Sequence, residues 1–239
     1  HPRVRRQRQM CIRDRNYTVQ FVCFEVNRKN IMYKYFKRTC DFMIALVALI
    51  ILFVPLIIVA IIIKLDSKGP VIFKQERLGK DGAPFKIWKF RSMCVDAEKQ
   101  GTGVYSYKGD KRITCVGKII RATSIDELPQ LVNILKGDMA LIGPRPALNY
   151  HPWPYEQYNE HQKHMFDVLP GVTGWAQVNG RKEVPWLERI ELNVWYAQHM
   201  SLGLDLKIFF MTIAKVVTNA NNENVGETGV KSKEENKNA

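Results

Sequence analysis

The sequence predicts a membrane-embedded protein of the α+β class. Two observations support this prediction: residues 42–63 form one uninterrupted apolar run, and the chain after Gly69 alternates short strand-like and helical pieces separated by Gly and Pro. A length of 239 residues is enough for one main folded domain and too short for two large ones. We therefore expect a membrane-embedded segment at 32–68, followed by a single domain at 69–218.

Both ends of the chain differ in composition from its middle. The formal net charge is +13, but residues 1–15 hold six Arg and one Asp, so +8 remains without them. That stretch has almost no apolar periodicity and does not begin with Met, so we expect residues 1–31 to be non-native or disordered, with a native start near Met32. Setting this stretch aside removes most of the support for a nucleic-acid binder, and no nucleic-acid partner is expected. Residues 219–239 lack aromatic side chains, which predicts a disordered tail.

The apolar run FMIALVALIILFVPLIIVAIII, residues 42–63, contains no charged side chain, and Pro55 is its only irregularity. At about 1.5 Å per residue it would form a helix of roughly 33 Å, long enough to cross the hydrocarbon core of a bilayer. A buried helix of a soluble protein is the alternative. Such a helix normally has a polar face, and this segment has none.

Positive residues flank this run on both sides. They are Lys34, Lys37 and Arg38 before it, and Lys64, Lys68, Lys74 and Arg77 after it. Because Lys and Arg mark the cytoplasmic side, both flanks are expected there, and Pro55 would kink the helix between them. We hypothesise a re-entrant helical hairpin that enters and leaves on one face. A spanning helix with a proline kink is the alternative.

A second membrane signal lies near the C-terminus. Apolar side chains at 202, 204, 206, 208–210, 213, 216 and 217 accompany Lys207 and Lys215, which predicts an amphipathic helix. This helix would either lie in the membrane interface or pack against the core of the domain.

Two strands are predicted at the start of the domain, in GPVIFKQERLG and PFKIWKFRSM, joined by the turn KDGA. Alternation in the second strand places Lys89 and Arg91 on one face, about 7 Å apart, where two cations could bracket a diphosphate. A solvated basic face is the alternative.

The stretch RATSIDELPQLVNILKGDM predicts a helix that begins between Ser124 and Asp126 and ends at Gly137. One interpretation is structural: Ser124 and Glu127 form a capping box, or Asp126 is the N-cap. The other is chemical. Adjacent helical residues point about 100° apart, so Asp126 and Glu127 suit two different tasks, with one attacking a phosphorus and the other holding a magnesium ion.

Arg145 follows in the rigid sequence GPRP, residues 143–146. The two prolines restrict the backbone, and the planar guanidinium suits phosphate oxygens. A structural turn with an exposed arginine is the alternative.

Together these motifs resemble the bacterial sugar transferase family, the monotopic polyprenyl-phosphate phosphoglycosyl transferases. The resemblance extends from about Tyr35 to Val217. Its ordered motifs are FKRTCDF before the apolar run, KLDSKGPVIFKQERLG, FKIWKFRSM, RATSIDELPQLVNILKGDM, GPRP, PGVTGWAQVNGR and SLGLDLKI. Each motif is weak alone, and seven in this order are specific.

The resemblance implies a mostly helical fold with a small β element, held on the cytoplasmic leaflet of the bacterial inner membrane by a re-entrant helix broken near Pro55. It implies transfer of a sugar 1-phosphate from a UDP-sugar to polyprenyl phosphate, with release of UMP. This reaction initiates the synthesis of exopolysaccharide, capsule, O-antigen or glycoprotein glycan. Asp126 matches the family's nucleophile, which forms a covalent phosphosugar intermediate, and Glu127 matches its Mg²⁺ ligand. Lys89, Arg121 and Arg145 match basic residues around the phosphates, and Asp205 matches an acidic residue near the C-terminal helix.

One position departs from the family pattern: Asn193 stands in ELNVWYA where the family usually has Asp, so any role of that carboxylate is in doubt. Longer members have a further N-terminal membrane region, and this chain could be a fragment of such a protein. The sequence leaves open the sugar, the pathway and the oligomeric state, a homodimer included. The alternative function is a non-catalytic scaffold that binds anionic membrane lipid, which gives no reason for the cluster Asp126, Glu127 and Arg145.

Overall fold

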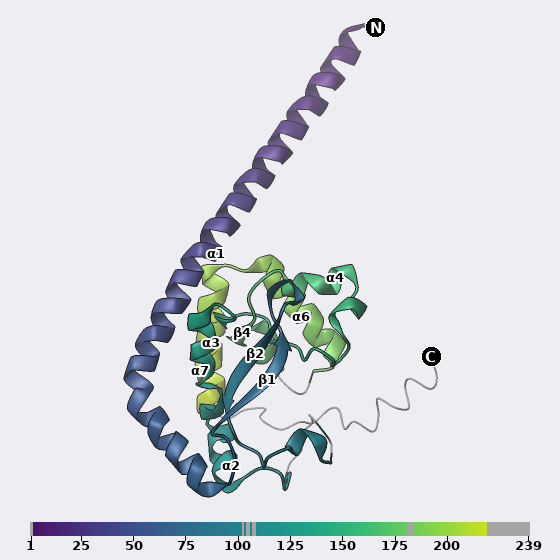
Figure 1. The fold of residues 1–239 in the computed structure, drawn as a ribbon. Helices are drawn as coiled ribbons and strands as arrows, with labels where there is room; N and C mark the ends of the chain where they lie inside the picture. Colours follow the sequence, from purple (N-terminus) through teal and green to yellow (C-terminus); the bar gives the residue numbers. More distant parts are fainter. Residues whose placement is uncertain (1, 102, 104–105, 107–108, 181–183, 219–239) are drawn as a thin grey trace, which may run out of the picture. The chain divides into compact units, whose positions relative to one another are not determined.

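The computed structural model describes residues 2–101, 103, 106, 109–180 and 184–218, with side chains from Met32 onward (Figure 1). The chain divides into two compact units, His1–Cys40 and Asp41–Ala239. The segment boundaries expected at 31/32 and 68/69, and the origin of residues 1–31, stay predictions. The tail expected to be disordered, 219–239, lies outside the described residues.

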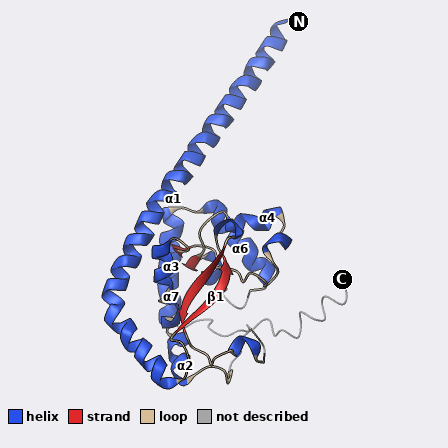
Figure 2. Cartoon of the chain, viewed as in Figure 1, coloured by secondary structure: helices blue, strands red, loops and turns tan. Residues whose placement is uncertain are grey.

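The described part of the chain is mostly helical with two small sheets, which confirms that part of the predicted fold class (Figure 2). The elements, with η for 3₁₀-helices, are α1 (Pro2–Asp66), β1 (Ile72–Leu78), η1 (Lys80–Gly82), β2 (Pro84–Phe90), η2 (Ala97–Lys99), α2 (Cys115–Ala122), η3 (Ile125–Glu127), α3 (Gln130–Lys136), β3 (Ala140–Ile142), η4 (Tyr155–Gln157), α4 (Glu160–Lys163), η5 (His164–Phe166), β4 (Gly171–Thr173), α5 (Trp175–Val178), α6 (Trp186–His199) and α7 (Leu202–Thr218). Strands β1 and β2 pair antiparallel, and β3 and β4 pair parallel.

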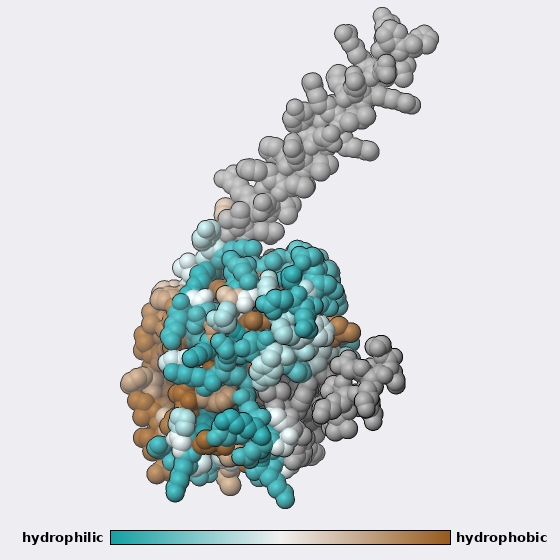
Figure 3. All heavy atoms as spheres, turned by 45° about the vertical axis from the view of Figure 1, so that its right-hand side comes forward, coloured by the Kyte–Doolittle hydropathy of each residue, from teal (hydrophilic) through white to brown (hydrophobic). Residues whose placement is uncertain are grey.

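The apolar run forms part of α1. Among the described residues, the segment Met32–Asp66 is both long enough and apolar enough to cross a membrane. Only 6% of its most apolar window is buried. Apolar surface left uncovered in this way favours lipid over water. The alternative of a buried soluble helix is therefore wrong, and the protein is membrane-associated. Figure 3 shows the hydrophobic surface running along this helix. The helix is continuous through Pro55, and its blue part is bent in Figure 1.

Two hydrophobic clusters join the second half of α1 to the rest of its unit. In one, Ala45 is fully buried with Ile87 of β2 and Ile134 of α3. In the other, Ile63 near the end of α1 is buried with Phe90 of β2 and Ile120 of α2. The membrane segment and the strand that bears Lys89 therefore pack as one body.

The predicted hairpin is confirmed, with η1 as its turn. Asn133 of α3 fixes β2 from behind, because its fully buried amide accepts a hydrogen bond from Trp88 N (2.9 Å) and donates one to the Lys86 carbonyl (2.8 Å). A second donated bond, 3.0 Å long, reaches Asp138. This amide holds the strand that bears Lys89 against the helix that follows Asp126.

Asn133→Leu is expected to lower the free energy of unfolding by about 3 kcal/mol, because two buried backbone groups lose their partners. Thermal unfolding in detergent measures the change. Asn149→Leu removes only the exposed bond to Glu76, and should cost about 0.5 kcal/mol or less. Equal melting temperatures for the two variants would contradict the assigned role of Asn133.

Helix α7 confirms the predicted C-terminal helix and shows two apolar faces. Ile208 is fully buried in a cluster with Tyr196 and Ile142, so one face packs on the domain. The other face leaves six large apolar side chains about half exposed: Leu202, Leu206, Phe209, Phe210, Ile213 and Val216. The packed face is thus established, and the exposed face is apolar enough to lie in a membrane interface.

Candidate active site

The stretch that contains Asp126 begins as a 3₁₀ turn. Ser124 has a left-handed φ of 58°, η3 covers Ile125–Glu127, and α3 begins only at Gln130, after Pro129. Helical structure thus begins inside the predicted window 124–126, but as a 3₁₀ turn that precedes the α-helix, and the predicted end at Gly137 (φ 98°) is confirmed. Neither Ser124 nor Pro129 caps through a side chain, so the capping box and the Asp126 N-cap are wrong. Both acidic side chains are left to make other contacts.

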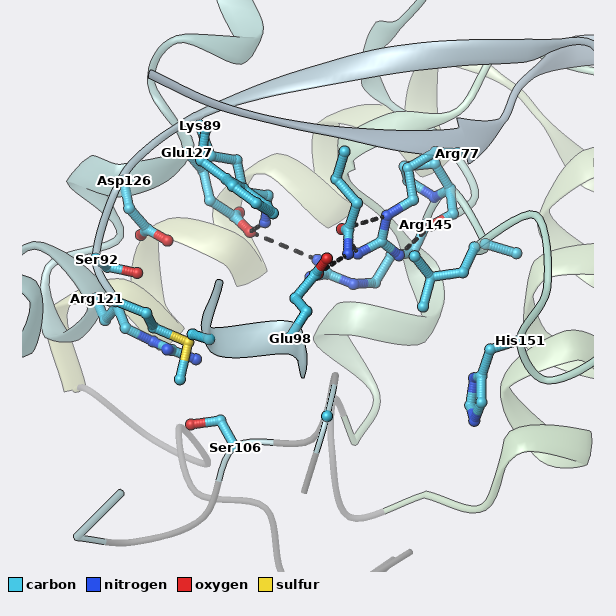
Figure 4. A pocket seen from close by; sticks show the side chains of 18 of the residues that line it. Arg77, Lys89, Ser92, Glu98, Ser106, Arg121, Asp126, Glu127, Arg145 and His151 are labelled. Carbon is cyan, nitrogen blue, oxygen red and sulfur yellow. Dashed lines mark hydrogen bonds and ion pairs between the residues drawn. The ribbon is translucent and has the colours of Figure 1, made fainter. Parts of the chain in front are cut away.

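Three of the predicted site residues meet in space. Lys89 Nζ of β2 donates to Glu127 Oε1 at 2.9 Å, and Arg145 Nη1 lies 3.7 Å from the same oxygen. The side chains of Lys89 and Glu127 are only 16% and 19% exposed, so their pairing is screened little by water. Figure 4 shows Asp126 beside this pair, with Arg121 facing the same opening.

The Asp126 carboxylate is partly buried, and no hydrogen bond reaches it from any residue that the structure describes. Burial raises its pKa above the ordinary value, and the charge of Glu127 adds to this effect. Lys89, Arg121 and Arg145 act in the opposite direction. A carboxylate that is poorly hydrated and unpaired in this way is a strong nucleophile when ionised.

Lys89 is affected by the same burial. Loss of hydration lowers the pKa of its ammonium group, and the charge of Glu127 partly restores it. The charge of Glu127 therefore favours the protonated form of this ammonium.

Arg77 of β1 belongs to the site and was missed in the sequence. Its guanidinium donates to Gln75 Oε1 (2.9 Å) and to the Pro146 carbonyl (3.1 Å), and burial, followed by the charge of Arg145, lowers its pKa to about 10. The strand pattern does contain a signal for Arg77. The register pairs Phe73 with Lys89 and Arg77 with Phe85, so Arg77 and Lys89 lie on the same face of the hairpin. Following that face from β2 across the predicted turn would have found Arg77.

Two other predicted residues make different contacts. Arg91 follows β2 and is 5% exposed, and its Nη2 donates to the Ser67 carbonyl (2.6 Å) and lies 3.3 Å from the Ile63 carbonyl. Its Nη2 binds the end of α1 while the side chain also borders the pocket, so its pairing with Lys89 around a diphosphate stays a prediction. Asp205 of α7 lies outside the pocket lining, where its Oδ1 is 2.6 Å from the Tyr196 hydroxyl.

One cavity of about 590 Å³ includes the whole cluster. Among the described residues, its wall contains four acidic side chains, Asp96, Glu98, Asp126 and Glu127, and seven cations, which are Arg77, Lys89, Arg91, Lys99, Arg121, Arg145 and Arg189. A second part of the wall is formed by α5 and α6. The volume is that of a typical small-molecule site, and the excess of cations favours an anionic ligand such as a diphosphate.

The turn that bears Arg145 is held by close backbone contacts. A Cβ added at Gly143 would lie 2.4 Å from the Leu169 carbonyl oxygen, and one at Gly174 would lie 1.9 Å from the Gly143 oxygen. Only glycine permits these approaches. Arg145 is thus presented from a rigid loop, as the sequence predicted.

The acidic side chains of the pocket can be compared with the ligands that Mg²⁺ prefers. No three His, Cys, Asp or Glu side chains gather to hold a metal within the described part of the chain. Mg²⁺ often binds through one or two carboxylates, while water and substrate phosphates supply the other oxygens. Asp126 and Glu127 offer two carboxylates at one pocket. This pair of carboxylates fits a magnesium ion that is bound together with substrate phosphates.

Several known proteins are similar to this chain over about three quarters of its length. The chain is 42% identical over 182 residues to the protein named "Uncharacterized sugar transferase EpsL" from Bacillus subtilis (strain 168), covering 76% of this chain and 87% of that protein. It is 43% identical to the UDP-glucose:undecaprenyl-phosphate glucose-1-phosphate transferase of Escherichia coli (strain K12), covering 77% of this chain and 40% of the relative. It is 42% identical to the UDP-N-acetylgalactosamine-undecaprenyl-phosphate N-acetylgalactosaminephosphotransferase of Aeromonas hydrophila, covering 78% and 45%.

The chain thus spans less than half the length of the last two relatives and most of the first. The family model described as "Bacterial sugar transferase" matches residues 32–219, which include every element from the membrane segment to α7. This match confirms the resemblance found in the sequence motifs, and the chain belongs to the bacterial sugar transferase family.

Proposed function

We propose that the protein transfers a sugar 1-phosphate from a UDP-sugar to polyprenyl phosphate, releasing UMP and initiating the synthesis of a surface glycan. One observation is the main support: Asp126, a partly buried carboxylate to which no described residue donates a hydrogen bond, shares a cavity with seven Lys and Arg side chains next to a membrane helix. The names of the relatives from E. coli and A. hydrophila describe this type of transfer. Release of UMP from a UDP-sugar by the purified protein, with Mg²⁺ and polyprenyl phosphate present, tests the proposal.

In the first step, a carboxylate oxygen of Asp126 attacks the sugar-bearing phosphorus. A new oxygen–phosphorus bond forms, the phosphoanhydride bond breaks, and UMP leaves with the bonding electrons. In the second step, a phosphate oxygen of polyprenyl phosphate attacks the same phosphorus. The bond to Asp126 breaks, the carboxylate is restored and polyprenyl-diphosphate-sugar is the product. Covalent catalysis thereby divides one transfer into two displacements at a single site.

The cations of the pocket counter the charge of the phosphates. Lys89 and Arg145 both approach Glu127 Oε1, and Arg121 faces the opening beside Asp126. Fixed positive groups in a partly dehydrated site stabilise charge on a transferred phosphoryl group more strongly than water does. A magnesium ion held by Glu127 would add further neutralisation of the phosphate oxygens.

The cavity lies close to the membrane segment. Ile125, immediately before Asp126, packs on the cluster that includes Leu56 and Val59 of α1. The same cluster contains Ile63, three residues before the end of α1 at Asp66. A lipid-borne phosphate at the membrane surface can therefore reach Asp126 without leaving the headgroup region. This proximity is the condition that a polyprenyl-phosphate acceptor imposes.

We further propose that α1 is re-entrant, with both flanks on the cytoplasmic face of the inner membrane. In a cysteine-free variant, single cysteines replacing Lys37 or Lys68 should both resist a membrane-impermeant maleimide in intact cells, and both should react after permeabilisation. The positive charge on both flanks is the reason for this expectation. Labelling of one position alone from outside would establish a spanning helix instead.

The raised pKa of Asp126 predicts a pH dependence. Only the ionised carboxylate attacks phosphorus, so kcat/KM should fall as pH decreases through a pKa above that of an ordinary aspartate, about 3.9. The charge of Arg121 lowers this pKa, so Arg121→Gln should move the acid limb to higher pH. Lys118→Gln, an exposed change on the same helix, should leave the limb in place. A limb that does not move in Arg121→Gln would show that another group controls it.

A non-catalytic scaffold that binds anionic lipid remains the rival function. It requires the exposed apolar helices but no cavity with a buried acid. A protein that binds anionic vesicles yet releases no UMP from any UDP-sugar would favour it.

A further inference from the structure

Two amide side chains in the pocket wall are buried without a hydrogen-bond partner. Gln177 of α5 is 8% exposed, and neither its Oε1 nor its Nε2 has a partner within the described residues. Asn193 of α6 is 5% exposed, and its Oδ1 is likewise unpaired there. Both residues line the cavity that contains Asp126. Buried polar atoms in proteins are nearly always satisfied, so a ligand or bound water is expected to reach these amides.

The cavity wall contains further neutral groups whose polar atoms are unpaired among the described residues. The Tyr158 hydroxyl, in a side chain that is 2% exposed, is also without a partner in the described part, and burial raises its pKa to about 12, so it stays neutral. The indole Nε1 of Trp186 has the same property. Of the seven Lys and Arg side chains in the described lining, Arg189 alone comes from α5 or α6, where its guanidinium lies over the Trp186 ring, 4.7 Å from the centroid, so most of the charge lies elsewhere in the wall. A nucleotide sugar has the matching division, with charge on its diphosphate and neutral hydroxyl or amide groups at its ends.

The position of Gln177 indicates which end of the ligand it meets. A Cβ added at Gly174 would lie 1.9 Å from the Gly143 oxygen and 3.0 Å from Gln177 Oε1, so the amide sits against the start of the GPRP turn. Two residues later in that turn, Arg145 approaches Glu127. The amide is thus next to the loop that contacts the reactive cluster. The group attached to the transferred phosphate is the sugar, not the uridine.

Relatives of nearly equal similarity to this chain are named for different sugars. The names of the E. coli and A. hydrophila proteins specify glucose and N-acetylgalactosamine, although the two are equally similar to this chain, at 43% and 42% identity. Discrimination between sugars that differ in one hydroxyl or acetamido group requires polar partners that are left unpaired by the wrong sugar.

We propose that Gln177 and Asn193 bind the hydroxyl or acetamido groups of the sugar ring and determine which UDP-sugar is accepted. This inference rests on the proposed transferase function. An amide can both donate and accept, so it can distinguish the orientation of a hydroxyl group. Neither side chain touches the reacting phosphorus in this scheme. Their effect is on selectivity.

The test compares kcat/KM for UMP release from UDP-glucose, UDP-galactose, UDP-N-acetylglucosamine and UDP-N-acetylgalactosamine. Gln177→Leu and Asn193→Leu should each reduce the ratio between the best and the worst sugar by about tenfold. Inhibition by UMP, which lacks the sugar, should change by less than about twofold. Asn193→Asp keeps the side-chain shape, and should change the ratio even if the leucine variants fold poorly.

Gln130→Leu is the matched control. Gln130 is 2% exposed and its Nε2 is unpaired among the described residues, but it does not line the cavity. Its replacement should leave the sugar ratio unchanged. Equal losses with all four sugars in the Gln177 and Asn193 variants would overturn the inference, as would a parallel rise in the UMP inhibition constant, which would assign the amides to the nucleotide. If the unaltered protein released no UMP from any of the sugars, the proposed function itself would fail.

Discussion

Asp126→Asn is expected to abolish UMP release, with a loss of at least about 10³-fold in kcat. The amide has nearly the same shape as the carboxylate but cannot form the bond to phosphorus. Because no described residue donates a hydrogen bond to Asp126, the substitution breaks no structural contact, and the fold and membrane association should persist. The relief of a buried charge should even favour the folded state slightly, since burial raises the pKa of this group.

The intermediate gives this prediction a second measurement. Without polyprenyl phosphate, the unaltered protein should release about one UMP per active site and retain the phosphosugar, visible as an added mass on the intact chain. Asp126→Asn should show neither. Asp167→Asn, an exposed change that affects only the contact with His164, should behave as the unaltered protein does. Full turnover by Asp126→Asn would refute the nucleophile assignment.

Local patterns in the sequence were sufficient to predict the secondary-structure elements that hold the site. Alternation and a turn motif predicted the β1–β2 hairpin, and Gly137 predicted the end of α3, because each depends on residues close together in the chain. Lys89, Glu127 and Arg145 were also found, although they come from three segments. The resemblance to the family supplied their common role, and the 2.9 and 3.7 Å contacts confirm that they meet.

What the sequence could not show depends on distant contacts. Arg91 looks like a partner of Lys89 by strand period alone, yet its guanidinium binds the carbonyl of Ile63, 28 positions earlier. The raised pKa of Asp126 likewise results from burial produced by the whole cavity. A glutamine in a motif also gives no sign that its amide is unpaired, as that of Gln177 is within the described residues. Such properties arise only when the chain folds.

Lys89→Met is expected to reduce kcat by about 10²- to 10³-fold. The buried ammonium is 2.9 Å from Glu127, and its charge also lowers the pKa of Asp126. Its loss removes positive charge from the phosphate site and makes Asp126 harder to ionise. The acid limb of the pH profile should therefore move to higher pH as well. A purely structural lysine would lower activity without that movement.

Lys86→Met provides a matched control, since Lys86 lies on the same strand with an exposed side chain. It should retain activity within about twofold, as surface changes usually do. Lys89→Arg keeps the charge but needs more room in a wall where Lys89 is 16% exposed, so activity should be restored only in part. If Lys89→Met kept full turnover and an unchanged pH profile, the other positive groups of the pocket would have to stabilise the transferred phosphoryl group without it. The pairing of Lys89 with Glu127 would then serve only to hold β2 against η3.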